Sequence, residues 1–149
     1  MIPILQYPKA KVTLRQKSVI VVKATQEVVN DMAEYKGQCL GLAAVQLGTP
    51  VRLIMVLFGD DYLFLVNPEV VKVSTQTWPF PEGCLSIGHG KELFTFHRPK
   101  RVKIRYMDLE GNQRTVKAEG LTARVLQHEI DHLEGNLIID WTLQRSEGE

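Results

Sequence analysis

The segment that most constrains this chain of 149 residues is Gln127-His128-Glu129-Ile130-Asp131-His132, which contains the pattern H-E-x-x-H. In an α-helix, positions i and i+4 lie almost above one another, so His128 and His132 can direct their imidazoles at one ion. Glu129 lies about 100° round the helix from His128, where its carboxylate is better placed to reach a water molecule at that ion than to bind the ion itself. The pattern therefore predicts a helix that supplies two neutral nitrogen ligands and a proton-accepting carboxylate.

The residues around this pattern favour a helix with an inward face. Thr122 is placed to cap its start, and a glycine follows its expected end at about Glu134. An apolar residue, Val125, shares the face of His128 and His132. Buried imidazoles need partners, which favours ligation over the alternative of two surface histidines one turn apart.

The histidine pair needs a third ligand, because a catalytic divalent ion usually has three protein ligands and one open position for water. The strongest candidate is Cys84, in Pro81-Glu82-Gly83-Cys84-Leu85-Ser86, since a thiolate and two neutral imidazoles leave the site with a net positive charge. The residues alone leave two alternatives open. Cys84 could be a small buried hydrophobe, and a carboxylate or another histidine (His89 or His97) could complete the site.

The rest of the pattern predicts an α+β fold, because strand-forming segments precede the histidine-bearing helix instead of alternating with helices. We expect antiparallel or mixed β-sheets packed around this central C-terminal helix, with one further helix near the N-terminus. Turn-forming residues break the apolar runs at Gly59-Asp60-Asp61 and Asn67-Pro68. The expected elements are a helix from Thr25 to about Lys36, ended by Gly37, strands near 51–58, 62–66 and 69–74, and a hairpin of 101–107 and 113–118.

No linker-like or low-complexity stretch divides the chain, so we expect residues 1–149 to form a single catalytic domain. The formal charge of +1 gives no general preference for nucleic acid, and no apolar run reaches the roughly 18 residues needed to span a bilayer. The opening residues lack the pattern of a secretory signal, which predicts a cytoplasmic protein. In that reducing compartment we expect Cys39 and Cys84 to be free thiols and not a disulfide.

Three segments together resemble the peptide deformylase family: Gly41-Leu42-Ala43-Ala44-Val45-Gln46, then Glu82-Gly83-Cys84-Leu85-Ser86, then Gln127-His128-Glu129-Ile130-Asp131-His132. Their order and separations fit the family, and the resemblance covers essentially the whole chain, including the opening Ile4-Leu5-Gln6-Tyr7-Pro8. It implies a metal-dependent hydrolase that removes the N-formyl group from the formyl-methionine of nascent polypeptides and releases formate. It also implies Fe²⁺ as the native ion, with Zn²⁺, Ni²⁺ or Co²⁺ as substitutes, whereas one cysteine and two histidines suit zinc equally well.

The resemblance assigns a role to each matching residue. The implied metal ligands are Cys84, His128 and His132. Glu129 would act as the general acid and base. The side chain of Gln46 and the backbone N–H of Leu85 would hold the formyl oxygen and stabilise the oxyanion that develops on it.

The substrate pocket is expected close to these residues. Gly41 would let the chain approach the backbone of a peptide substrate, as in recognition by strand addition. The family prefers methionine after the formyl group, and the candidates for an apolar pocket are Leu40, Phe80, Leu121 and Val125. The alternative for each of the four is an ordinary place in the core.

The chain departs from the family pattern at two places near the site. Cys39 stands where the first motif usually opens with glycine, either as a small buried residue or as a redox-sensitive thiol. After Ser86 the family often continues with Pro-Gly, whereas this chain has Ile87-Gly88-His89-Gly90-Lys91, which affects the substrate-facing rim and not the metal chemistry.

The partners expected from the resemblance are N-formylmethionyl peptides and the ribosome near its exit tunnel. We expect the C-terminal helix that some deformylases use for ribosome docking to be short or missing. The basic run 98–105, if it forms a strand, would place Val102 and Ile104 toward the core. Arg101, Lys103 and Arg105 would then form a solvated face, with ribosomal RNA contact as the alternative. The host would be a bacterial or phage-infected cell, with an organelle as the alternative.

Two other functions are compatible with parts of this sequence. A small endopeptidase of the H-E-x-x-H kind would need a downstream histidine or carboxylate ligand, and only Glu134, Asp140, Glu147 and Glu149 follow the helix. A deformylase-like domain that binds peptide or metal without turnover would be expected to lack Glu129 or Gln46. Both residues are present.

Overall fold

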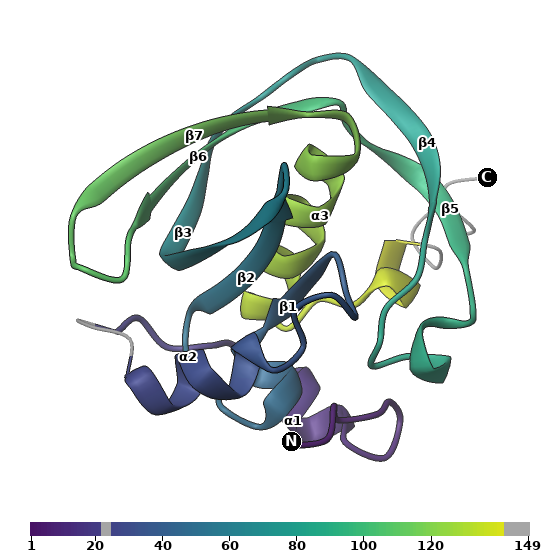
Figure 1. Ribbon diagram of the computed structural model, residues 1–149. Helices are drawn as coiled ribbons and strands as arrows, with labels where there is room; N and C mark the ends of the chain where they lie inside the picture. Colours follow the sequence, from purple (N-terminus) through teal and green to yellow (C-terminus); the bar gives the residue numbers. More distant parts are fainter. Residues whose placement is uncertain (22–24, 142–149) are drawn as a thin grey trace.

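Two antiparallel β-sheets enclose the helix that carries the H-E-x-x-H pattern (Figure 1). The computed structural model describes residues 1–21 and 25–141. The larger sheet has the strand order β1-β2-β3-β6-β7, and the smaller sheet pairs β4 with β5. The helix α3 (Gly120–Leu133) lies between them, with the larger sheet on one side and the β4–β5 ribbon on the other. The expected α+β fold around a C-terminal helix is therefore confirmed.

Two further α-helices lie near the N-terminus, and the paired strands of both sheets run antiparallel. The helices are α1 (Lys11–Leu14) and α2 (Gln26–Ala33). The strands are β1 (Gly41–Ala43), β2 (Leu53–Phe58), β3 (Asp61–Val73), β4 (Thr77–Glu82), β5 (Phe94–Pro99), β6 (Arg101–Met107) and β7 (Gln113–Glu119).

The strand β2 is buried on both faces, which explains its unbroken apolar sequence. Ile54 and Val56 belong to the core cluster that includes the inward residues of α3, whereas Leu53 and Met55 belong to the cluster that includes α2. Successive side chains of a strand point to opposite faces, so one strand supplies both cores. Full burial of a side chain of this size contributes about 1.5–3 kcal/mol. The edge strand β1 pairs with β2 and is thereby fixed beside α3.

The interruption expected at Asn67-Pro68 was wrong. β3 runs without a break from Asp61 to Val73, and its pairing with β6 shifts register across this point, between Val66 and Glu69, and again between Val70 and Lys72. Asn67 has a φ of 50°, and its side chain bonds both the N–H and the C=O of Val21. A β-bulge therefore accommodates Asn67 and Pro68 within the strand.

Two helix boundaries also differ from expectation. α3 begins at Gly120 and not at Thr122, because a φ of 64° at Gly120 turns the chain from β7 into the helix earlier. Its expected end is confirmed, with Gly135 at a φ of 77°. α2 ends at Ala33, before Lys36, and hydrogen-bonded turns continue to the expected Gly37.

The ribbon β4–β5 and the short elements α1 and β1 were not predicted. Pro79 and Pro81 alternate along β4, and proline normally argues against a strand because it lacks an N–H donor. In the part of the chain that the structure describes, β4 pairs only with β5, so its other edge tolerates this loss. No helix within residues 1–21 and 25–141 is both long and apolar enough to cross a bilayer.

Candidate metal centre

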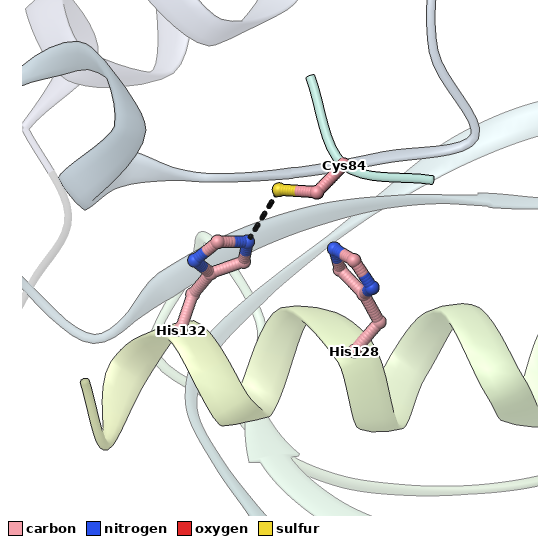
Figure 2. A group of neighbouring side chains, drawn as sticks. All are labelled: Cys84, His128 and His132. Atoms are coloured by element: carbon pink, nitrogen blue, oxygen red, sulfur yellow. Dashed lines mark hydrogen bonds between the residues drawn. The ribbon is translucent and has the colours of Figure 1, made fainter. Parts of the chain in front are cut away.

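Three buried side chains converge where the end of the β4–β5 ribbon meets α3 (Figure 2). Cys84 comes from the turn after β4, and His128 and His132 come from successive turns of α3. One ligand atom from each residue lies within 4.8 Å of those of the other two, and Cys84 Sγ is 3.4 Å from His132 Nε2. The structure therefore brings the predicted thiol and imidazoles together. A buried cysteine that only fills space, or a pair of surface histidines, would not form such a cluster.

The orientation of His128 is fixed from behind by Glu82. The Nδ1 atom of His128 is 2.9 Å from Glu82 Oε1, so Nε2 is the nitrogen left facing Cys84. A carboxylate in this place selects the tautomer that keeps a free lone pair on the other nitrogen. The ring of His132 lies 5.1 Å from that of His128, at an angle of 64°. Its Nδ1 is buried without a hydrogen-bond partner among the described residues.

The charges around the cluster favour a cation. Burial by itself lowers the pKa of His128, but Glu129, Cys84 and Glu82 raise it well above its ordinary value. Burial and the positive charge of His128 lower the pKa of His132, so this ring is held neutral. A soft thiolate, two imidazoles and surplus negative charge fit a divalent metal ion.

Glu129 lies beside the cluster and has a free acceptor atom. Its side chain is 4% exposed, and Oε1 has no hydrogen-bond partner in residues 1–21 and 25–141. Burial raises the pKa of the carboxyl to about 7, although the charge of His128 acts in the opposite direction. A carboxylate with this pKa can both accept and return a proton near neutral pH.

Gln46 reaches the cluster from the opposite side. Its Oε1 accepts a hydrogen bond from the Ala43 N–H at 2.9 Å, which fixes the amide orientation. Its Nε2 donates to Ser86 Oγ at 3.0 Å and lies 3.9 Å from Cys84 Sγ. An amide nitrogen carries two hydrogens, so one remains directed at the metal centre. Gln46 is buried, so its amide is not a solvated group of a surface loop.

A cavity of about 420 Å³ opens onto this centre. Its lining includes every predicted site residue except His132: Leu40, Gly41, Gln46, Phe80, Cys84, Leu85, Leu121, Val125, His128 and Glu129. Leu40 is 47% exposed and Leu121 is 44% exposed, so an ordinary core position is excluded for both. Phe80 and Val125 are partly buried. Gly41 has no side chain, and a Cβ there would lie only 2.7 Å from Glu129 Oε2.

The sequence did not predict the buried ionic network around Glu82. Arg98 bonds Glu82 through Nε at 2.7 Å, and Arg124 bonds it through Nη1 at 2.6 Å. Arg98 also pairs with Asp131 at 2.8 Å. Burial by itself raises the pKa of Glu82, but hydrogen bonds from His128 and Arg98 lower it to about 2. Arg98 is 1% exposed, so it does not belong to the solvated face expected for the basic run.

Cys39 is a half-buried residue of the cavity wall. Its thiol lies 3.6 Å from the Tyr35 carbonyl oxygen, and burial raises its pKa to about 12. A protonated thiol is a poor nucleophile, which favours the packing role over the redox-sensitive one. Both cysteines are free.

Fold and site together define a class of protein. A buried Cys–His–His cluster lies beside a carboxylate with a free acceptor atom and opens onto a mainly apolar cavity. This is the arrangement of a metal-dependent hydrolase with an open coordination position.

Comparison with known proteins identifies the family. The chain belongs to the polypeptide deformylase family, whose sequence model matches residues 1–147. It is 40% identical to peptide deformylase of Bartonella tribocorum, over 79% of this chain and 70% of that protein. It is 39% identical to peptide deformylase of Rickettsia prowazekii, over 86% of this chain and 81% of that protein.

Solved structures agree with this assignment. The crystal structure of peptide deformylase from Thermotoga maritima superposes with a TM-score of 0.85 at 32% identity, covering 95% of this chain and 97% of that one. A probable peptide deformylase from Synechococcus phage S-SSM7 gives a TM-score of 0.84 at 34% identity, covering 95% and 99%. The activity of the family is metal-dependent removal of the N-formyl group from nascent peptides. The family and the enzymatic activity predicted from the sequence are confirmed.

Proposed function

We propose that this chain deformylates N-formylmethionyl peptides with Cys84, His128 and His132 as metal ligands and Glu129 as general acid and base. The observation that carries the proposal is the juxtaposition of three buried ligand atoms within 4.8 Å and the unpartnered Oε1 of Glu129. We further propose the whole chain, residues 1–149, as one catalytic domain.

The ion proposed for this site is Fe²⁺, with Zn²⁺, Ni²⁺ or Co²⁺ as substitutes. The donor set of one thiolate and two imidazoles accepts all four, so the choice of iron rests on the family resemblance. When bound, the ion supplies Lewis-acid chemistry that makes water acidic enough to ionise near neutral pH.

Glu129 moves the proton in the proposed reaction. Its carboxylate takes the proton from the attacking water as the water oxygen adds to the formyl carbon. The same carboxyl then returns the proton to the nitrogen of the departing amine. Burial supports this double role, because it raises the pKa of Glu129 to about 7.

Gln46 and Leu85 stabilise the oxygen of the formyl group. As negative charge develops on that oxygen, it accepts hydrogen bonds from the backbone N–H of Leu85 and from the Nε2 hydrogen of Gln46 that contacts Cys84 Sγ at 3.9 Å in this structure. Donors that are fixed before the reaction lower the barrier without reorganisation. The hydrogen bond that Gln46 accepts from the Ala43 N–H and the one that it donates to Ser86 Oγ fix this side chain.

The cavity receives the substrate. The proposed pocket for the methionine side chain is lined by Leu40, Phe80, Leu121 and Val125, and Gly41 allows the peptide backbone to approach Glu129. Apolar side chains that already stand partly in solvent gain burial when a substrate covers them. A residue that serves only the fold would not become more buried when substrate binds.

We also propose a cytoplasmic location and contact with the ribosome near its exit tunnel, because nascent polypeptides emerge there. Relatives from Bartonella and Rickettsia support a bacterial type of enzyme. A phage-infected cell is also proposed as the host, because a probable peptide deformylase from a Synechococcus phage has a similar structure.

The proposed function is tested by formate release from formyl-Met-Ala-Ser. The wild type should release formate, and Glu129→Ala should keep the metal and lose at least about 10²-fold in kcat. Glu110→Ala, a change at an exposed turn residue, is the matched control and should retain full activity. Retained activity in Glu129→Ala would refute the proton-transfer role. Cleavage of an unformylated peptide without formate release would instead favour an endopeptidase.

A further inference from the structure

The outer face of the larger sheet carries a row of three lysines. Lys72 on β3 lies directly opposite Lys103 on β6, which in turn lies directly opposite Lys117 on β7. Figure 1 shows these three strands side by side. Val102 and Ile104, the neighbours of Lys103, are buried in the core with α3, so Lys103 points away from the helix. We call Lys72, Lys103 and Lys117 the lysine row.

The lysine row is not matched by acidic side chains. None of the three lysines forms an ion pair within residues 1–21 and 25–141. Like charges directly opposite each other destabilise a sheet. The repulsion among the three lysines therefore lowers the stability of the isolated chain. An anion bound across them would compensate this repulsion, which would explain why the lysines lie together.

The rows on either side of the lysines show that this surplus is local. On one side, Arg105 forms a 2.9 Å ion pair with Glu69. On the other side, Arg101 lies directly opposite Glu119. Each flanking row therefore places a carboxylate opposite an arginine, whereas the lysine row between them contains no carboxylate.

The surface of the row fits an extended polyanion. A groove of about 530 Å³ runs over it, and none of the residues that line this groove is aromatic. Adjacent strands are about 4.8 Å apart, so the row spans about 10 Å. Each strand of a DNA duplex carries one phosphate per about 3.4 Å of helix axis, so a stacked strand of about three nucleotides matches the length of the row.

We propose that the lysine row binds the phosphate backbone of RNA. This inference rests on the proposed function for the choice of RNA, because the substrates are polypeptides still being made. Anionic membranes are less well matched, since the groove offers no aromatic side chain to enter the bilayer interface. The contact is independent of base sequence, because a lysine ammonium that meets a phosphate reads no base.

The test is fluorescence anisotropy of a short labelled single-stranded RNA of mixed sequence, titrated with the full-length, metal-loaded protein. Three phosphate contacts predict a slope of log K against log salt of about −2. The double variant Lys103→Gln/Lys117→Gln should bind at least about tenfold more weakly at low salt and reduce the slope by about 1.4. Because the substitutions also remove repulsion, this variant should unfold at the same temperature as the wild type or a higher one.

The matched control is Lys9→Gln/Lys11→Gln, which removes the same charge from exposed residues outside the sheet. It should bind RNA like the wild type. The proposal is overturned if the row variant binds as tightly as the wild type, or if both variants weaken binding equally. It is also overturned if the wild type binds vesicles of phosphatidylserine and phosphatidylcholine but no RNA. Formate release from formyl-Met-Ala-Ser should be unchanged in both variants, so a failure of RNA binding remains distinct from a failure of the proposed function.

Discussion

Substituting alanine for Gly41 should damage catalysis by displacing Glu129. A Cβ at this position would lie 2.7 Å from Glu129 Oε2, 2.9 Å from Glu129 Cγ and 2.7 Å from Val125 Cγ1. The Gly41 backbone cannot retreat easily, because β1 is paired with β2 opposite Val56. The side chain of Glu129 must therefore move, and its unpartnered Oε1 offers little resistance.

The size of the effect follows from the contact distances. The lower limit of ordinary contact, 3.4 Å, exceeds 2.7 Å by 0.7 Å, so a shift of this size is needed. Misplacing a catalytic group by about 1 Å can cost about 10²-fold in rate. We therefore expect kcat for formyl-Met-Ala-Ser to fall by about 10- to 10²-fold in Gly41→Ala. Overpacking should lower the free energy of unfolding by about 1–3 kcal/mol.

The assay combines formate release, metal content and thermal unfolding. Metal content should be unchanged, since the three atoms nearest to the new Cβ belong to Glu129 and Val125 and not to Cys84, His128 or His132. Gly111→Ala is the control. Its added Cβ meets no atom within 4 Å, and its φ of 91° strains the backbone without touching the site. It should lose stability and keep kcat. Wild-type kcat in Gly41→Ala would refute the argument that Glu129 needs the space above this glycine.

Three further predictions concern the network, the oxyanion and the pocket. Glu82→Gln should lower the free energy of unfolding by about 3 kcal/mol at neutral pH, because Arg98 and Arg124 lose their shared charge. The depressed pKa of Glu82 stabilises the fold above pH about 4.5. In urea unfolding curves, the difference in free energy of unfolding between wild type and variant should therefore disappear toward pH 2. A difference that stays constant with pH would contradict this. Gln46→Ala should lower kcat by about 10²–10³-fold with metal content unchanged, and a loss below about twofold in steady-state kinetics would remove Gln46 from the mechanism. Leu121→Ala should lower kcat/KM for formyl-methionyl peptides by about tenfold while the unfolding temperature stays the same; a change in stability alone would return Leu121 to a structural role.

The helix that carries the histidines could be predicted because its signals are local. The i, i+4 spacing of His128 and His132 and the apolar face on which they lie are independent of the rest of the chain. The hairpin of β6 and β7 was predicted for the same reason, and its bounds agree to within one residue, since β7 ends at Glu119 and not at Ala118. Local pattern failed where tertiary structure overrides it. Asn67-Pro68 fits inside a long strand because a bulge absorbs it.

The network around Glu82 was out of reach for a different reason. Its members come from β4, β5 and α3, and no short-range pattern relates Glu82 to Arg98 or Arg124. The basic run gave no sign that Arg98 would be buried, and it is buried because two carboxylates compensate its charge. The residues that lie opposite each other on neighbouring strands could not be predicted from the sequence either. The members of the lysine row, for example, are 31 and 14 positions apart in the chain.

The ligand set is tested most directly by X-ray absorption spectroscopy of the zinc-loaded protein. One sulfur at about 2.3 Å and two nitrogens at about 2.0–2.1 Å are predicted for the wild type and for Cys39→Ser. Cys84→Ser should lose the sulfur. A spectrum without sulfur in the wild type, or one that keeps its sulfur in Cys84→Ser, would contradict the assignment of Cys84, His128 and His132 as the metal centre.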